Sequence, residues 1–376
     1  MSIRRHDVHV CLVSEQATPN FIPVLDSRFR PREVILLVSQ QMRRQAEWLS
    51  EALRRRVEKV SEHIVDDAWD VAGIQDTLLE LVAARQSAGL ALNVTGGTKP
   101  MAIAAQDVFR AEGLPIFYVH PANNQVVPIF SSEPPFSIQE RVGLADYLAI
   151  HGFREVARAG ADESDGHALL AEEFVMEVER FAKQLRKLNW LAHNAEKTLR
   201  VDLGSGAKDE RLGELLDKLV RYDLARIEGR NLVFPNEAAR AFVNGGWLEL
   251  HVARVVAAHA AELGVQSHAR SLVVESAGGA RNELDVAFLA HNRLFLIECK
   301  TKRLDGPEAE GPGGESLYKL DSLTALGGLN TRGMLASYQP VERWDRQRAD
   351  DLRIRIVEGG ELRNMARHLR AWVNGS

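Results

Sequence analysis

Short apolar runs alternate with amphipathic stretches over the first third of the chain. Continuous apolar runs occur at 8–13, 34–38 and 90–94, as expected for strands that are buried on both faces. Between them, apolar residues recur at every third or fourth position over about 41–56, 74–87 and 99–112, which is the spacing of one helix face. This alternation predicts a doubly wound α/β domain with a parallel sheet over residues 1–150.

The middle of the chain has a different pattern, with helical spacing over 169–188 and again over 211–222. The segment 225–234 then has the pattern of a hairpin that turns at 229–231. Helices followed by a small hairpin predict a winged-helix-like domain at 165–244. Such a domain can read DNA or act as a structural bridge. Because the segment 211–224 contains about as many acids as bases, the bridge is favoured.

Two apolar runs near the carboxyl end, 284–288 and 294–300, are separated by a short polar segment. This pattern predicts two antiparallel strands joined by a tight turn. A helix is expected to begin near Gly246, another covers 316–323, and a late strand alternates apolar and basic residues over 352–356. The last third is therefore predicted to be a second α/β domain, over residues 245–376.

Composition limits the class of protein. A chain of 376 residues with 45% hydrophobic residues is expected to form two or three domains with separate cores. Its two cysteines, Cys11 and Cys299, provide no disulfide framework and indicate a reducing compartment. No apolar run reaches membrane-spanning length, and the first residues lead into a strand without a signal peptide, so a soluble cytoplasmic protein is expected.

The net charge of −5 and the pI near 6.2 exclude a generally basic nucleic-acid-binding surface. Any contact with a polynucleotide must therefore be local and partly mediated by metal.

Asp285, Glu298 and Lys300 are the candidate catalytic residues on the predicted hairpin. Glu298 and Lys300 are two positions apart and leave the same face of their strand, close to Asp285 on the partner strand. Two carboxylates at such a separation repel each other and favour a hard divalent cation that also binds a substrate phosphate. Lys300 can orient an attacking water. The alternative is a surface Asp285 and an exposed ion pair between Glu298 and Lys300.

The order Asp, spacer, Glu-x-Lys resembles the PD-(D/E)xK nuclease superfamily, which has the restriction-endonuclease-like fold, over roughly residues 245–370. The resemblance implies that Asp285 and Glu298 hold Mg²⁺ or Mn²⁺, that the backbone carbonyl of Cys299 is a further ligand, and that Lys300 assists the nucleophile. An acidic residue on the preceding helix is another family feature, which makes Glu249 a candidate third carboxylate. Leu284 precedes Asp285, at the position where the family motif has proline.

Polar loops follow three predicted strands of the amino-terminal domain, at 14–20, 39–41 and 95–101. Ligands bind at the carboxyl ends of strands in such sheets. In the third loop two glycines allow a close backbone approach, Thr98 begins a helix, and Lys99 adds a cation, which together can bind an anion. The spacing is neither a Walker A loop nor GxGxxG. A tight turn capped by Thr98 is the alternative.

These loops resemble those of the CARF domain, the CRISPR-associated Rossmann fold, over roughly residues 1–150. The resemblance implies a homodimer that binds a cyclic oligoadenylate across its two-fold axis, since a symmetric ligand needs a symmetric receptor. The implied contacts are Ser14, Gln16, Thr18, Asn20, Gln40, Thr95, Gly96, Gly97, Thr98, Lys99 and Met101.

A CARF domain before an Asp…Glu-x-Lys nuclease resembles the Can/Card type of ancillary nuclease in type III CRISPR systems. It implies an antiviral nuclease, activated by cyclic tetra-adenylate, that cuts single-stranded DNA or RNA, or supercoiled duplex DNA, with little sequence preference. No membrane partner is expected. The alternative is a nucleotide-sensing transcriptional regulator that uses the winged-helix-like segment and keeps a degenerate nuclease domain as a scaffold.

Overall fold

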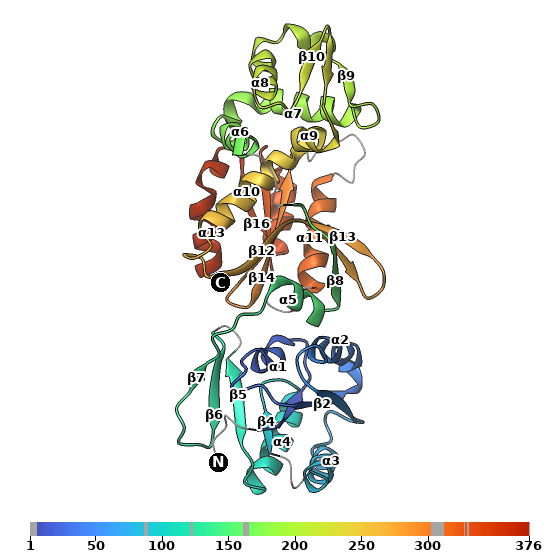
Figure 1. Cartoon of the computed structure of the whole chain (residues 1–376), viewed down its shortest axis with the longest axis vertical. Helices are drawn as coiled ribbons and strands as arrows, with labels where there is room; N and C mark the ends of the chain where they lie inside the picture. The colour runs from blue at the N-terminus through green and yellow to red at the C-terminus, as the bar shows by residue number, and fades with distance from the viewer. Residues whose placement is uncertain are drawn as a thin grey trace.

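The computed structural model describes residues 6–85, 89–120, 123–160, 165–301, 312–326, 328 and 331–375. Three sheets of seven, three and six strands organise these residues. The amino-terminal domain lies at one end of an elongated molecule, the six-stranded sheet in the middle, and the three-stranded sheet at the other end (Figure 1). None of the helices in the described part of the chain has the length and apolar composition that crossing a bilayer requires.

The amino-terminal sheet has the order β3-β2-β1-β4-β5-β6-β7, with the first five strands parallel and the last two antiparallel. Its strands are β1 (Val8–Leu12), β2 (Glu33–Ser39), β3 (Lys59–Val65), β4 (Leu90–Asn93), β5 (Ile116–His120), β6 (Gln125–Ile129) and β7 (Phe136–Ser137). The three apolar runs form β1, β2 and β4, which are buried throughout apart from the first residue of β2.

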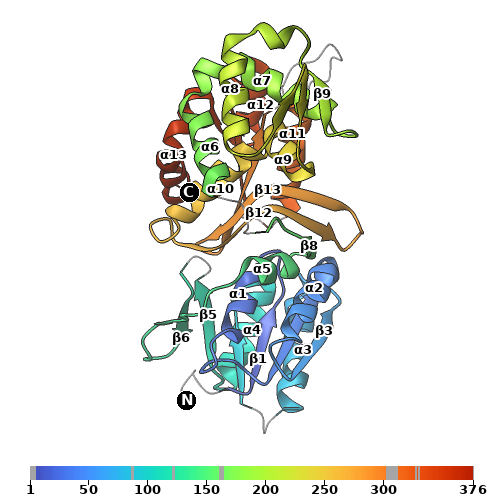
Figure 2. The ribbon, with the colours of Figure 1, turned by 45° about the horizontal axis from the view of Figure 1, so that its top comes forward.

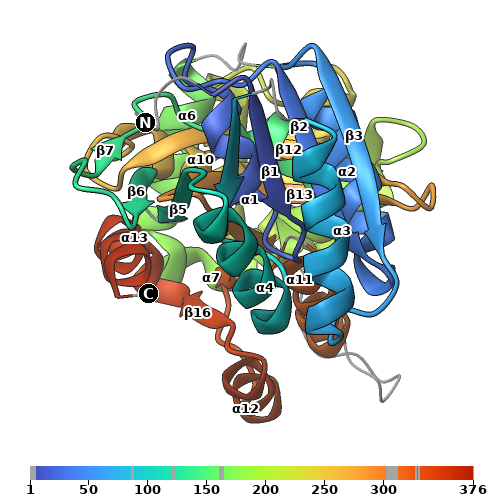
Figure 3. The ribbon, with the colours of Figure 1, turned by 90° about the horizontal axis from the view of Figure 1, so that it is seen from below.

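Helices cover both faces of this sheet, which confirms the predicted doubly wound architecture. α3 (Val71–Ala83) and α4 (Lys99–Ala111) lie side by side on one face (Figure 3). α1 (Thr18–Phe21), α2 (Arg43–Leu53) and α5 (Leu144–Ile150) cover the other face. The order of the strands reverses between β1 and β4, so the loops that follow β1, β2 and β4 meet at the switch point of the sheet.

The carboxy-terminal sheet has the order β16-β15-β14-β13-β12-β8. Its strands are β8 (Phe153–Ala157), β12 (Val265–Ser276), β13 (Arg281–Ala290), β14 (Arg293–Lys300), β15 (Arg332–Ser337) and β16 (Arg355–Glu358). The predicted hairpin is β13–β14, which turns at His291 and Asn292 with φ of 52° and 57°. Positive φ at both turn residues matches the twist of a two-residue hairpin loop. β16 begins later than predicted because Arg353 has φ of 56° and is not extended.

Helices pack on both faces of this sheet as well. α6 (Asp165–Met176), α10 (Trp247–Ala258) and α13 (Met365–Asn374) share one core, and α11 (Pro312–Leu326) and α12 (Arg343–Asp351) contribute to the core on the other side. That second core continues into the amino-terminal domain. The hairpin β12–β13 lies over α5, and β8 follows α5 directly (Figure 2). The two α/β domains are therefore packed against each other.

The central segment contains α7 (Val178–Asn194), α8 (Glu210–Arg221), α9 (Glu237–Ala241) and an antiparallel sheet of β10 (Arg226–Glu228), β11 (Asn231–Val233) and β9 (Arg200–Asp202). The single helix predicted over 169–188 is two helices, α6 and α7, on either side of Glu177. Although this segment lies between the other domains in sequence, it packs beyond the carboxy-terminal sheet (Figure 1). It does not bridge them in space, which differs from the expected arrangement.

Candidate active site

The predicted catalytic residues line one cavity of about 470 Å³ at the end of the β13–β14 hairpin. Asp285, Glu298, Cys299 and Lys300 come from the hairpin, and Glu249 comes from the first turn of α10. The fold therefore brings the predicted residues of the hairpin and of the preceding helix together in one cavity. The cavity also contains Glu283, Arg270 and Ser271.

The position of Asp285 follows from the way in which the hairpin opens. The register of β13 with β14 runs from Ala290 and Arg293 to Val286 and Ile297, next to Asp285. The Asp285 carboxylate then accepts a hydrogen bond of 2.6 Å from the backbone N–H of Cys299. Burial raises the pKa of Asp285 to about 8, and repulsion from Glu298 and Glu249 contributes to the rise. The site therefore holds carboxylates that oppose each other's ionisation.

Glu298 is 9% exposed and forms an ion pair with Lys319 of α11, with 3.0 Å between Oε2 and Nζ. Burial of Lys319 opposes its charge, but the attraction and hydrogen bond of Glu298 outweigh this effect and raise the pKa of the amine. Lys319 therefore neutralises part of the negative charge of the cavity. Lys300 leaves β14 on the same face as Glu298 and lines the cavity.

Glu249 is connected to the same group of carboxylates. Its Oε2 accepts a hydrogen bond of 2.8 Å from the Ser271 hydroxyl. Burial raises the pKa of Glu249, and repulsion from Glu283 and Glu298 acts in the same direction. Glu283 was not among the predicted site residues. It stands two positions before Asp285 on the same strand, which is the spacing that linked Glu298 to Lys300.

The donor atoms fit a hard divalent cation, because they are carboxylate oxygens in a partly buried site where like charges repel. Among the residues that the structure describes, however, no group of three His, Cys, Asp or Glu side chains is placed to hold a metal ion. Asp285, Glu298 and Glu249 instead each accept a hydrogen bond from a partner in the protein. An ion at this site would require some of these partners to be exchanged.

The predicted ligand loops meet at the carboxyl ends of β1, β2 and β4. A Cβ at Gly96 would lie 2.1 Å from the backbone oxygen of Leu12 and 3.2 Å from the Ser14 hydroxyl, so this loop packs closely on the loop after β1. Gly97 has φ of 74°, a conformation that favours glycine. Gln40 begins the segment after β2 and is exposed. Gln16 is half-buried, and Lys99 is exposed at the start of α4.

Two threonines of these loops use their hydroxyl groups within the domain. Thr95 donates to the side chain of Asn93 and accepts from the backbone N–H of Val119. Thr98 caps α4 by accepting from the N–H of Met101 at 3.3 Å, and it donates to the carbonyl of Ala68. The predicted cap is confirmed, and the hydroxyl groups of Thr95 and Thr98 both have partners within the domain.

Three of the predicted ligand contacts belong to the core. Thr18 and Asn20 are 2% and 1% exposed, and Met101 is fully buried. The Asn20 amide donates to the carbonyl of Leu12, and its oxygen accepts from Asn93. These side chains support the loops from beneath, and the structure does not support their assignment as direct ligand contacts. Their burial depends on tertiary packing, which the loop sequence does not reveal.

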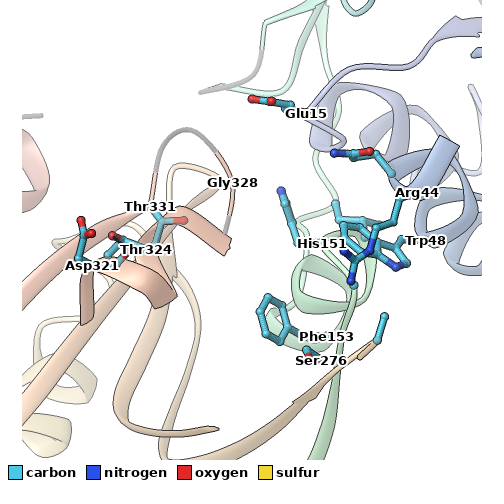
Figure 4. A pocket seen from close by; sticks show the side chains of 14 residues that line it. Glu15, Arg44, Trp48, His151, Phe153, Ser276, Asp321, Thr324, Gly328 and Thr331 are labelled. Carbon is cyan, nitrogen blue, oxygen red and sulfur yellow. Dashed lines mark hydrogen bonds between the residues drawn. The ribbon is translucent and has the colours of Figure 1, made fainter. Parts of the chain in front are cut away.

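A pocket of about 620 Å³ lies at the junction of the two α/β domains, and the sequence did not indicate it. Glu15, Arg44, Trp48 and His151 face Asp321, Thr324 and Thr331 across the pocket (Figure 4). Glu15 belongs to the loop after β1, whereas Asp321 and Thr324 belong to α11, the helix that carries Lys319. The pocket thus lies between a predicted ligand loop and the helix whose Lys319 pairs with Glu298.

Two family models match the chain, one described as the Card1 CARF domain over residues 8–147 and one as the Card1-like endonuclease domain over residues 236–375. Together they cover well over half of the chain. A comparison with curated proteins gave no match.

Several solved structures are similar over nearly the whole chain. Protein VC1899 from Vibrio cholerae has 29% sequence identity and a TM-score of 0.88, with 98% of each chain covered. Can2 from Sulfobacillus thermosulfidooxidans, in complex with cyclic tetra-adenylate, has 28% identity and a TM-score of 0.79, also with 98% of each chain covered. A type III CRISPR defence DNA nuclease activated by cyclic oligoadenylate shares the fold, with 22% identity, a TM-score of 0.57, and 89% of this chain and 46% of that chain covered. The chain therefore belongs to the Card1-like family of CARF-domain effector nucleases.

Proposed function

We propose that this protein is a metal-dependent nuclease that cyclic tetra-adenylate switches on. The observation that carries the proposal is the cavity in which Asp285, Glu298, Lys300 and Glu249 meet, within the endonuclease domain of a chain that also has a CARF domain. The similarity to Can2, which was solved with cyclic tetra-adenylate, supports the choice of activator. The sensing domain occupies residues 1–150 and the nuclease domain 245–376, with the segment 165–244 packed beside the catalytic domain.

The residues of the cavity divide the chemistry of phosphodiester hydrolysis among them. Asp285 and Glu298 would hold Mg²⁺ or Mn²⁺, with the carbonyl of Cys299 and the carboxylate of Glu249 as further ligands. A bound ion would polarise the phosphate and lower the pKa of a water. Lys300, which lines the same cavity, would orient an attacking water and add positive charge beside the phosphate. The water oxygen would bond to phosphorus while the bond from phosphorus to the leaving oxygen breaks, and that oxygen would take up a proton, so that one new chain end is a phosphate and the other a hydroxyl.

The lysine of α11 gives the switch a physical basis. Lys319 pairs with Glu298 in this structure, and Glu298 is a proposed metal ligand. The pocket between the domains lies between Glu15, in a ligand loop, and Asp321, on the same helix as Lys319. A ligand that binds two CARF domains better in one arrangement than in another shifts the population towards that arrangement. Movement of α11 across the pocket would then free Glu298 for metal.

A cleavage assay tests the proposal. The homodimer is incubated with Mn²⁺ and single-stranded DNA, single-stranded RNA or supercoiled plasmid, with and without cyclic tetra-adenylate. Cleavage of at least one polymer that requires both the metal and the activator is expected. Glu298→Gln should abolish cleavage and retain binding of cyclic tetra-adenylate in calorimetry, because the substitution lies in the other domain. Binding of the activator with no cleavage of any polymer by the unmodified protein would refute the enzymatic assignment and favour a regulator.

A further inference from the structure

One face of α7 has positive charges around an exposed tryptophan. Lys183, Arg186, Lys187 and Trp190 follow the spacing of one helix face, and Trp190 is 53% exposed. The opposite face of α7 is buried in the core through leucines 185, 188 and 191. We call Lys183, Arg186, Lys187 and Trp190 the α7 stripe. The buried leucines already hold α7 in the core, so the packing of the helix does not depend on the residues of the stripe.

The three cations of the α7 stripe have no ion-pair partner in the part of the chain that the structure describes. Within the described residues, no carboxylate forms an ion pair with any of the three, whereas Arg180 on the same helix is paired with Glu177 and Glu214. Lys187 lies 4.3 Å from the centre of the Trp190 ring. A hollow of about 550 Å³ adjoins the stripe. Asp209 is the carboxylate among its described lining residues, and it caps α8. The surface therefore complements an anion with a flat apolar group.

The α7 stripe lies beside the catalytic cavity. Asn189, on the next face of α7, donates a hydrogen bond of 2.5 Å to the carbonyl of Thr301, which directly follows Lys300. Burial raises the pKa of Tyr338, and the charge of Arg186 acts in the opposite direction. The N–H of Tyr338 in turn lies 3.4 Å from the carbonyl of Lys300. Through Asn189, α7 thus contacts the residue that directly follows Lys300 at the end of β14.

We infer that the α7 stripe binds a single-stranded polynucleotide and guides it to the cavity of Asp285 and Glu298. Its cations bind successive phosphates, and Trp190 stacks on one base. An unpaired strand fits better than a duplex, because the stripe spans only about 10 Å of helix and the indole face can stack on a base that is not already stacked. The inference rests on the proposed nuclease function for its biological role, but the binding itself can be measured separately.

The experiment measures fluorescence anisotropy of a labelled single strand with the homodimer and cyclic tetra-adenylate, in EDTA so that no cleavage occurs. Single-stranded DNA, single-stranded RNA, a duplex of the same sequence and poly-glutamate are compared. Trp190→Leu should weaken single-strand binding about 5- to 100-fold, the usual effect of losing one stacked base. Trp344→Leu, at an exposed tryptophan of α12, is the matched control and should have no effect. Lys183→Ala should reduce the salt dependence of binding by about one phosphate contact.

The outcomes separate this inference from the proposed function. Unchanged single-strand affinity in Trp190→Leu, with normal metal-dependent cleavage, would overturn the inference and leave the nuclease intact. Loss of single-strand affinity in that variant, in a protein that cleaves nothing, would support the α7 stripe and refute the nuclease. Equal affinity for poly-glutamate and the single strand would overturn the inference in favour of an acidic protein partner. In Mn²⁺, Trp190→Leu should raise KM with kcat little changed, as expected for a binding contact remote from the reacting atoms.

Discussion

Replacement of Asp285 by asparagine should stabilise the metal-free protein while abolishing cleavage. The pKa of Asp285 is raised to about 8 from 3.8, first by burial and then by Glu298 and Glu249. At pH 7 the carboxyl is therefore mostly protonated when folded and ionised when unfolded, which lowers the free energy of unfolding by about 4 kcal/mol at most. Asparagine removes this penalty and its oxygen can still accept from the N–H of Cys299. We expect a gain of about 2 to 4 kcal/mol.

The pH dependence gives the sign of the effect. Because the folded pKa of Asp285 is raised, its contribution is neutral below pH 3.8, becomes increasingly destabilising as pH rises towards 8, and is constant above that. The stability difference between Asp285→Asn and the unmodified protein should therefore grow from pH 5 to pH 8. Urea unfolding in EDTA, followed through the buried Trp247 and Trp372 of the carboxy-terminal core, measures it.

A control variant and a measurement with added Mn²⁺ complete the stability test of Asp285→Asn. Glu283→Gln removes an exposed carboxylate two residues away and should change stability little. With cyclic tetra-adenylate present, added Mn²⁺ should stabilise the unmodified protein and have little effect on Asp285→Asn, since a ligand that binds only the folded state raises its stability. An Asp285→Asn protein that is less stable than the unmodified one at pH 8, or a difference that shrinks from pH 5 to pH 8, would refute the electrostatic reasoning.

Three further predictions concern other parts of the molecule. Lys319→Met leaves the buried Glu298 carboxylate unpaired and should lower the free energy of unfolding by about 2 kcal/mol in EDTA. Mn²⁺ should restore this stability, and thermal unfolding with and without the metal measures both effects. Gly96→Ala places a Cβ 2.1 Å from the oxygen of Leu12 and should lower the affinity for cyclic tetra-adenylate at least about tenfold in calorimetry. Gly143→Ala, where the new Cβ has nothing within 4 Å, should bind the ligand normally. Burial, with repulsion from a neighbouring histidine, lowers the pKa of His9 to about 3, so the free energy of unfolding decreases as pH falls below 6.5. In urea unfolding, His9→Phe should remove about 2 kcal/mol of the decrease between pH 7 and pH 5. An unchanged decrease would contradict this prediction.

The sequence was most informative where the pattern was local. The β13–β14 hairpin was predicted because two apolar runs flank a short turn, and the same pattern located Asp285 and Glu298. β12, over Val265–Ser276, was missed because polar and apolar residues are mixed along it, and its place in the sheet depends on pairing with distant strands. β3, over Lys59–Val65, was missed for a similar reason, since it is an edge strand with many polar residues.

Relations between distant side chains were the part that sequence could not provide. The ion pair of Lys319 with Glu298 joins a helix to a strand, and no spacing along the chain encodes that distance. Asn20 is likewise buried and hydrogen-bonded to Leu12 and Asn93, so its side chain is not exposed in the ligand loop. The position of the central segment beyond the carboxy-terminal sheet was also hidden, because order in sequence does not fix order in space.

The most direct test of the central claim is an anomalous-difference map from crystals of the protein grown with cyclic tetra-adenylate and Mn²⁺. We expect one peak per protomer within about 2.5 Å of carboxylate oxygens of both Asp285 and Glu298, with Lys319 no longer paired to Glu298. The same peak should be absent from Asp285→Asn crystals. A map with full activator density and no manganese peak in this cavity, or with the metal held elsewhere, would contradict the account.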